Sequence, residues 1–193
     1  MRLVHPFKGG FEMDREKAIK AVEDLLKALG EDLNREGLKD TPRRVADAFA
    51  EFVSGEGKSA KEHLEKTFSC EGSEMVVEKD IEFSSTCEHH LMPFFGKIAI
   101  AYIPDKKVVG LSKLARTVEV YAKRLQLQER LTEQIADAIM KYLKPKGVLV
   151  ACEGVHTCMT CRGIKKADSK TFTYSVKGAF PDENKKEVFS LIK

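Results

Sequence analysis

The sequence predicts an α+β domain in which an antiparallel sheet carries helices on one face, with a helical region before it. Three observations predict this class. Helical periodicity dominates roughly the first 60 residues, it returns in a central block, and strand-like segments lie on both sides of that block. The order β-β-α-α-β-β is typical of an antiparallel sheet with its helices on one side. At 193 residues, the chain is long enough to bury one sizeable core.

Two amphipathic helices are predicted in the N-terminal region. The first runs from Asp14, an N-cap residue, to Gly30, a residue type that often ends helices. The second begins at Thr41 as the cap, with Pro42 in the first helical position, and ends near Ser54. The apolar positions expected to point inward are Ile19, Val22, Leu25, Leu26 and Leu29, followed by Val45, Ala48, Phe49, Phe52 and Val53. Residues 1–60 are therefore expected to form a small helical region.

Residues 61–193 are expected to form the main domain. Its first strand is predicted from the strand-like residues 75–77 and 81–83, and its second at 97–103, closed by Pro104 and Asp105. Two helices follow at 112–124 and 129–143, and then strands at 147–153 and 170–179 and a short helix at 182–192. This order places both central helices between two pairs of strands.

The charge balance gives no sign of a polyanionic partner. The chain has 33 Lys and Arg against 30 Asp and Glu, a net charge of +3, with the signs interspersed. We therefore expect neither nucleic acid nor membrane as a partner. The longest apolar runs, 97–103 and 147–152, are far shorter than the ~20 residues of a membrane span. Because the first 14 residues also lack the apolar core of a signal peptide, we expect a cytoplasmic protein.

Cysteine and histidine gather in two short segments. The chain has five cysteines, and in a reducing compartment clustered thiols are more often metal ligands or catalysts than disulfides. The first segment, STCEHH at 85–90, contains Cys87, His89 and His90, and the second, HTCMTCRG at 156–163, lies about 70 positions downstream. Thiolate and imidazole groups suit Zn²⁺. Cys70 and Cys152 lie outside both segments and are expected to be inert.

Two kinds of zinc site are compatible with these spacings. Cys87 and His90 can converge from one turn, and His156 and Cys158 share a face if their segment is extended. If Cys161 also binds, the site has four protein ligands and is structural. If only three residues bind, one position stays open for water, whose pKa the metal can lower to ~7. His89 and His156 would then be acid/base groups beside it.

The segment GLSKLAR at 110–116 resembles an anion site at the start of a helix. Ser112 can cap that helix, while Lys113 and Arg116 add positive charge to the free amides of its first turn. An ordinary capped helix with solvated basic residues is the alternative. With Arg44 and Arg162 in the same chain, an anionic substrate is a further option.

Five motifs in order resemble one family. TPRRVA at 41–46, STCEHH at 85–90, GLSKLAR at 110–116, QERLT at 128–132 and HTCMTCRG at 156–163 are similar to the motif series of zinc-dependent GTP cyclohydrolase I. The resemblance implies a tunnelling fold, an antiparallel four-stranded sheet with two helices on one face, as the catalytic domain at 61–193. It also implies hydrolysis of GTP to 7,8-dihydroneopterin triphosphate and formate, the entry to pterin and tetrahydrofolate synthesis.

The resemblance assigns roles to individual residues. One Zn²⁺ per subunit would be held by Cys87, His90 and Cys158, which favours the open site and leaves Cys161 unassigned. The catalytic residues would be His89, His156 and Ser112. The substrate-binding residues would be Arg44, Lys113, Arg116, Gln128, Glu129 and Arg162, with Glu129 selecting guanine and the basic residues holding the triphosphate. Asp47 stands where some family members have a basic residue that touches phosphate.

The same resemblance implies a homo-oligomer, a decamer of two pentamers whose active sites lie between subunits. Two other functions stay open at this point. One is a zinc-stabilised nucleotide-binding module, and the other is a different purine- or pterin-acting enzyme of the tunnelling fold. The Cys87, His90 and Cys158 trio with its paired histidines argues against the second, because relatives with other chemistry need not keep a hydrolytic metal.

Overall fold

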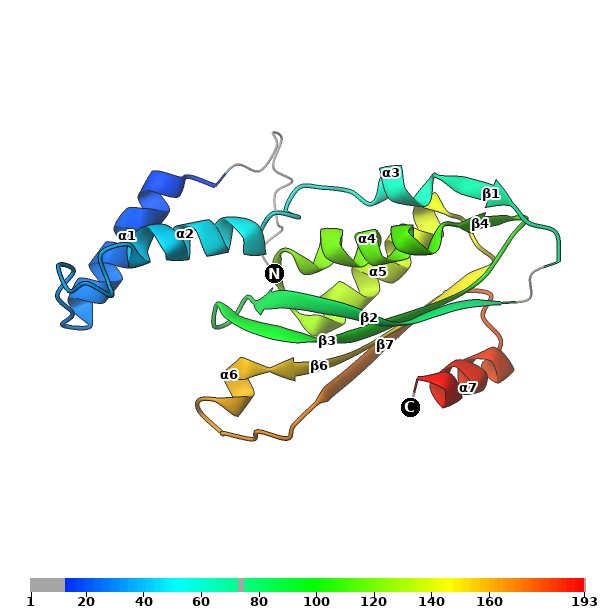
Figure 1. The fold of residues 1–193 in the computed structure, drawn as a ribbon. Helices are drawn as coiled ribbons and strands as arrows, with labels where there is room; N and C mark the ends of the chain where they lie inside the picture. The colour runs from blue at the N-terminus through cyan, green and yellow to red at the C-terminus, as the bar shows by residue number, and fades with distance from the viewer. Residues whose placement is uncertain (1–12, 73–74, 193) are drawn as a thin grey trace, which may run out of the picture.

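The computed structural model describes residues 13–72 and 75–192, and its centre is an antiparallel sheet (Figure 1). The sheet consists of β2 (Val76–Cys87), β3 (Met92–Ile103), β6 (Gly147–His156) and β7 (Thr171–Gly178). A two-residue strand, β5 (Leu125–Gln126), adds a short parallel edge beside β2. The helices α4 (Leu111–Ala122) and α5 (Gln128–Tyr142) lie on one face of this sheet. The predicted α+β class, with four antiparallel strands and two helices on one face, is confirmed.

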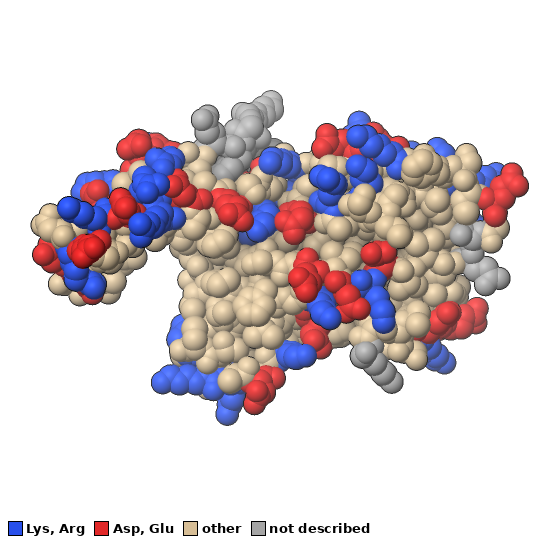
Figure 2. All heavy atoms as spheres, in the orientation of Figure 1, with Lys and Arg blue, Asp and Glu red and all other residues tan. Residues whose placement is uncertain are grey.

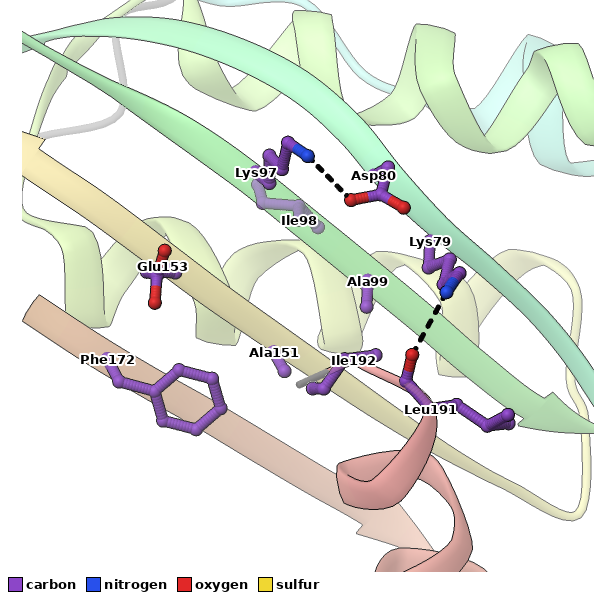
Figure 3. Close-up of a pocket in the computed structure, with 10 residues that line it drawn as sticks. All are labelled: Lys79, Asp80, Lys97, Ile98, Ala99, Ala151, Glu153, Phe172, Leu191 and Ile192. Carbon is purple, nitrogen blue, oxygen red and sulfur yellow. Dashed lines mark hydrogen bonds and ion pairs between the residues drawn. The ribbon is translucent and has the colours of Figure 1, made fainter.

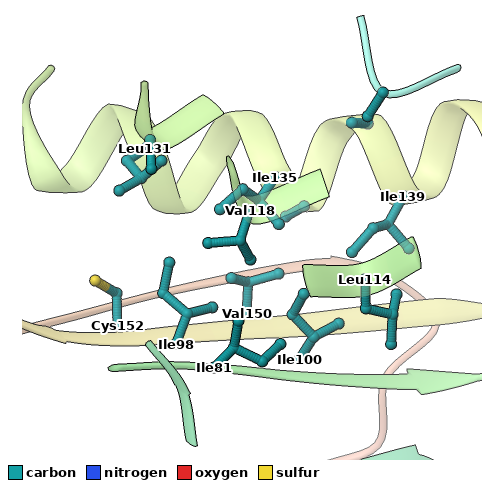
Figure 4. Packing of buried hydrophobic residues seen from close by; sticks show 14 of the residues in the cluster. Ile81, Ile98, Ile100, Leu114, Val118, Leu131, Ile135, Ile139, Val150 and Cys152 are labelled. Carbon is teal, nitrogen blue, oxygen red and sulfur yellow. The ribbon is translucent and has the colours of Figure 1, made fainter. Parts of the chain in front are cut away.

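The main core lies between the sheet and these two helices (Figure 4). Successive residues of a strand point to opposite faces, so every second residue of β3 and β6 meets the helices. Ile98 pairs with Cys152 and Ile100 with Val150, and all four are fully buried. The helices contribute Leu114, Val118, Leu131, Ile135 and Ile139, which Figure 4 shows pointing toward the sheet.

The opposite face of the sheet carries the last helix, α7 (Asp182–Leu191). Here the alternate residues of the same strands, such as Ala101, Leu149 and Ala151, pack with Phe180 and Val188. Burial of both faces explains why β6 reads as an almost continuous apolar run. The terminal helix predicted at 182–192 is therefore present, but it covers the face that the predicted architecture left without helices.

The N-terminal helices α1 (Arg15–Ala28) and α2 (Thr41–Phe52) pack on each other and extend away from the sheet (Figure 1). Asp14 caps α1, since its side chain accepts a hydrogen bond from the Lys17 amide at 3.0 Å. The prediction that Thr41 caps α2 is wrong: Asp40 occupies that position and Thr41 is the first helical residue.

The predicted inward face of α1 is only partly confirmed, because Ile19, Val22 and Leu26 are half-buried. None of the residues of α1 is buried, and Leu25 and Leu29 are 58% and 69% exposed. The helical region predicted at 1–60 begins with residues 1–12, which lie outside the described part of the chain, as does most of the N-terminal segment used to exclude a signal peptide. Among the helices that are described, none combines the length and the apolar character that crossing a bilayer demands.

Four further small elements were not predicted, and two details of the predicted elements change. α3 (Lys61–Leu64) precedes β1 (Thr67–Ser69), which pairs with β4 (Lys107–Val109), and α6 (Thr157–Thr160) follows β6. The strand predicted from 75–77 and 81–83 is β2, and its register with β3 shifts between Glu78 and Ile81, beside Asp80, whose φ is 58°. Gly110, not Ser112, is the N-cap of α4, so Ser112 lies inside the helix.

Candidate active site

Three potential metal ligands converge at the end of the sheet where β2 turns into β3. Cys87 is the last residue of β2, His90 lies in the turn, and Cys158 lies in α6, directly after β6. The ligand atoms of all three lie within 4.8 Å of one another, with 3.8 Å between Cys87 Sγ and His90 Nδ1. The two motifs that are about 70 positions apart in sequence therefore meet at one point.

Local backbone structure explains how each segment presents its ligands. In the β2–β3 turn, the amides of His90 and Leu91 both donate to the carbonyl of Cys87, at 3.3 and 2.9 Å, and Leu91 takes a left-handed φ of 53°. The turn therefore folds His90 back over Cys87. The expectation that His156 and Cys158 share a face of an extended segment is wrong, because the strand ends at His156 and Cys158 lies in a helical turn.

The donor set fits a soft, divalent cation. Two sulfurs and one imidazole nitrogen are ligands that Zn²⁺ prefers. Burial raises the pKa of the Cys158 thiol, and the adjacent Cys87 sulfur raises it further, while Arg162 opposes the shift. A bound cation has the opposite effect on the pKa of the Cys158 thiol, because coordination deprotonates a thiol outright. Two sulfurs held this close together are therefore better suited to a metal than to an empty protein site.

The other cysteines take no part in this group. Cys161 is exposed, and its thiol donates to the Thr157 carbonyl at 2.8 Å. In the described residues, the group that could hold a metal contains Cys87, His90 and Cys158 without it. Burial raises the pKa of the Cys152 thiol to about 12, so that residue stays protonated and apolar in character. The geometry thus favours the three-ligand alternative over the four-ligand one.

His156 stands beside the ligand group in a well-defined position. Its ring stacks on Phe94, with centroids 4.5 Å apart and planes within 4°, and its Nε2 lies 2.8 Å from the Gln128 side-chain oxygen. Burial lowers the pKa of His156, and the charge of Glu129 opposes that shift. At neutral pH the imidazole is therefore kept available to accept a proton. Phe94 carries no chemical signal in the sequence, and only the structure reveals its contact with His156.

A polar network holds the turn that carries His90. Glu88, between Cys87 and the histidines, pairs with the guanidinium of Arg130 on α5. Arg130 also donates to Gln126 Oε1 at 2.9 Å and to the Leu125 carbonyl at 2.7 Å. Glu88 and Arg130 both lie in motifs that the sequence singles out, but nothing in the sequence showed that they meet.

The remaining predicted residues divide into two groups. Near the ligands are His89, whose ring centroid is 6.2 Å from that of His90, together with Arg162 and Glu129, whose charges act on Cys158 and His156. Glu129 also borders an open groove of about 380 Å³ along β7. These side chains are exposed and available to a ligand.

Ser112, Lys113 and Arg116 lie in the half of α4 that is remote from the ligand group. They belong to the first turns of α4, whose far end is fixed beside the metal group by a hydrogen bond of 2.6 Å from Ser85 Oγ to the Ala122 carbonyl. Ten residues of helix separate Ser112 from Ala122, a distance of about 15 Å along the axis. Arg44 is on α2, exposed and paired with Asp40 at 3.2 Å. One chain does not bring these basic residues to the ligand group.

Other surface features do not resemble this site. Figure 3 shows a separate cavity of about 100 Å³ between the sheet and α7, and its lining includes none of the ligand residues. Its charged groups are used internally, since Lys97 pairs with Asp80 at 2.8 Å and Lys79 donates to the Leu191 carbonyl at 3.0 Å. Figure 2 shows Lys and Arg interspersed with Asp and Glu on the face it presents, without one dominant basic patch.

Comparison with known proteins places the chain in a family. The profile of GTP cyclohydrolase I matches residues 18–193. GTP cyclohydrolase 1 of Clostridium perfringens is 54% identical over 182 residues, which cover 93% of this chain and 98% of that protein. The enzyme of the same name from Carboxydothermus hydrogenoformans is 59% identical over 169 residues, covering 87% of this chain and 88% of that protein.

Among solved structures, the apo form of the archaeosine synthase QueF-Like is similar at a TM-score of 0.46 and 18% identity, over 57% of this chain and all of that one. A likeness this weak carries no weight in the assignment. The match over residues 18–193 and the relatives above half identity decide it, together with a Cys/His/Cys group placed where two motifs meet. The chain belongs to the GTP cyclohydrolase I family.

Proposed function

We propose that this protein hydrolyses GTP to 7,8-dihydroneopterin triphosphate and formate, with one Zn²⁺ per subunit at Cys87, His90 and Cys158. The observation that carries the proposal is the three-ligand group with His156 fixed beside it, in a chain of this family. When bound to three protein ligands, Zn²⁺ supplies Lewis acidity and makes hydroxide available near neutral pH.

The chain's own residues supply proton transfer and recognition. His156 would hold the proton that the purine imidazole ring receives as it opens, and exposed His89 would assist the second hydrolytic step, which releases formate. Glu129 can accept from both the ring N–H and the exocyclic amino group of guanine, a donor pair that adenine lacks. Ser112 would act later, at the ribose rearrangement.

The triphosphate site requires a second copy of the chain in this proposal. Lys113 and Arg116 lie about 13 and 9 Å along α4 from Ala122, the end that adjoins the metal group, and Arg44 is on α2. Arg162 alone is close to Cys158. A homo-oligomer, most simply the decamer of two pentamers, would bring one subunit's basic residues to the next subunit's metal. Residues 1–60 would form its helical arm and 61–193 its catalytic domain.

A cytoplasmic location completes the proposal. All five cysteines are free thiols, which suits a reducing compartment. On the face that Figure 2 shows, Lys and Arg are interspersed with Asp and Glu, so this face offers no uniformly basic surface to nucleic acid or to a membrane.

The direct test is incubation of purified, zinc-loaded and assembled protein with GTP. Formate and the fluorescent neopterin obtained after oxidation are expected in equal amounts, and ATP, as the matched control, is expected to give neither. Absence of both products from GTP would refute the proposed function. Equal turnover of ATP would remove Glu129 from base selection.

A further inference from the structure

The Gln128 side chain is fully engaged by protein groups. It is 1% exposed, although it lies at the start of α5, next to exposed Glu129. Its Nε2 lies 3.1 Å from the Cys152 carbonyl, 3.0 Å from the Thr171 carbonyl and 3.2 Å from Thr173 Oγ1. Its Oε1 faces His156 Nε2 at 2.8 Å. Little of this amide is left for direct contact with a substrate, although the family resemblance places it among the substrate-binding residues.

The direction of each hydrogen bond around the amide is determined. Backbone carbonyls only accept, so the side of Gln128 that faces Cys152 and Thr171 must be its NH₂ group. Thr132 Oγ1 donates to the Gln128 main-chain carbonyl at 2.8 Å, so in its 2.7 Å contact with Thr173 the Thr173 hydroxyl is the donor. Thr173 Oγ1 is therefore free to accept from Gln128. The side-chain oxygen of Gln128 must then face His156.

This orientation decides which ring nitrogen of His156 carries hydrogen. The Gln128 oxygen can only accept, so Nε2 of His156 is the N–H nitrogen, in the neutral ring and in the protonated one alike. The stacked ring of Phe94, itself fully buried, fixes the plane of the imidazole. With the plane and one nitrogen fixed, Nδ1 is the atom left to face a ligand, and no described residue forms a hydrogen bond with it.

We propose that Gln128 is a positioning residue, which holds His156 in the Nε2–H form and thereby presents Nδ1 to the substrate. The proposal rests on the proposed function for the role of His156, but not for the orientation of its ring. Gly154 belongs to the same arrangement. A Cβ at that position would lie 2.6 Å from Gln128 Oε1, so only glycine leaves room for the amide oxygen where His156 meets it.

Two variants and a matched control test this role in the full-length protein. Gln128→Met keeps the approximate volume and removes the acceptor, whereas Gly154→Ala keeps every polar group and displaces the amide oxygen. Gln134→Met is the control, because it makes the same change on the same helix. The one amide that Gln134 binds, Gln126 Nε2, keeps its 2.8 Å bond to the Tyr121 carbonyl.

The readouts are histidine tautomers and steady-state kinetics. Solid-state ¹⁵N NMR of histidine-labelled protein, assigned with a His156→Gln sample, is expected to show N–H at Nε2 and a bare Nδ1 in wild type. In both variants, part of His156 is expected to show the Nδ1–H tautomer. Both variants are also expected to lower kcat by at least about tenfold, with the KM for GTP within about threefold of wild type. The control is expected to match wild type, and zinc content is expected to be equal in all four proteins.

Three results would overturn the inference. These are an Nδ1–H tautomer in wild type, an unchanged tautomer in folded Gln128→Met, or a raised KM with unchanged kcat, which would make Gln128 a direct substrate contact. If wild type shows the expected tautomer but forms no formate from GTP, the proposed function fails while the orientation of His156 stands. The two failures are therefore distinguishable.

Discussion

Cysteine serves three different purposes in this chain, and its surroundings decide which. Cys152 lies in the core between β6 and α5, where burial raises its pKa to about 12 and makes it a small apolar residue. Cys87 and Cys158 face each other and an imidazole. Cys161, three positions after Cys158, is exposed and bonded only to a local carbonyl. The sequence predicted that Cys152 is inert, but spacing alone could not separate Cys158 from Cys161.

The rate at which each cysteine is alkylated is expected to follow the exposure of its thiol. In zinc-loaded native protein, iodoacetamide should modify Cys161 well before the two ligand cysteines, and should not reach Cys152, because alkylation requires an accessible thiolate. A chelator should then make Cys87 and Cys158 reactive while Cys152 stays protected. Mass spectrometry of peptides at timed intervals measures this. Labelling of Cys158 as fast as Cys161 before chelation would contradict the assignment.

At the level of helices and strands, periodicity predicted the elements better than their ends. The two central helices and the strands of the sheet lie where apolar spacing placed them, because that spacing is set by burial. β2 and β3 extend beyond the predicted segments toward the β2–β3 turn. At the end of β2, Ser85, Thr86 and Cys87 are buried although they are polar or thiol residues, so apolar spacing could not predict this part of the strand. Cap positions also differed, since backbone geometry placed Asp40 and Gly110 there instead of Thr41 and Ser112.

The ion pair that joins α1 to α2 is expected to weaken at low pH. Arg15 bonds the Asp47 carboxylate at 2.7 Å, which lowers the pKa of Asp47, and Arg43 adds to this at 3.5 Å. A lowered folded-state pKa stabilises the protein above the unfolded value of about 3.9, and the contribution is lost as pH falls through the folded value. Asp47→Asn should therefore melt slightly below wild type at pH 7, and the difference should shrink as the pH falls below the unfolded value and vanish once Asp47 is protonated in the folded protein.

The measurement is a pair of melting curves for wild type and Asp47→Asn at several pH values and low salt. Since both partners are exposed, the difference should also shrink at high ionic strength. A gap that widens as pH falls would contradict the sign of this linkage.

At the scale of the whole molecule, the residues proposed for the site lie in two separate parts of the fold. The metal group and His156 lie where β2, β3 and β6 meet α6 (Figure 1), whereas Lys113 lies near the start of α4 and Arg116 borders a hollow beside α3. The sequence named both groups, but it could not show whether they converge, because convergence depends on tertiary and quaternary structure. This division is what makes a subunit interface the natural place for the proposed triphosphate site.

Mixed oligomers are expected to recover activity from two inactive variants. Cys158→Ser removes a metal ligand and Arg116→Ala a phosphate contact, so each alone should be nearly inactive. If each site takes its metal from one subunit and Arg116 from another, random co-assembly leaves about a quarter of the sites intact. Co-expression followed by a formate assay measures this recovery. No recovery in demonstrably mixed oligomers would place both residues in one subunit's site.

The proposed activity depends most directly on a zinc site with three protein ligands. The decisive measurement compares Cys158→Ser with Cys161→Ser, purified in parallel, for bound zinc by mass spectrometry and for formate released from GTP. We predict that Cys161→Ser keeps about one zinc per subunit and turnover near that of wild type, whereas Cys158→Ser loses both. Equal loss of zinc and turnover in the two variants would contradict the account and restore the closed four-ligand site.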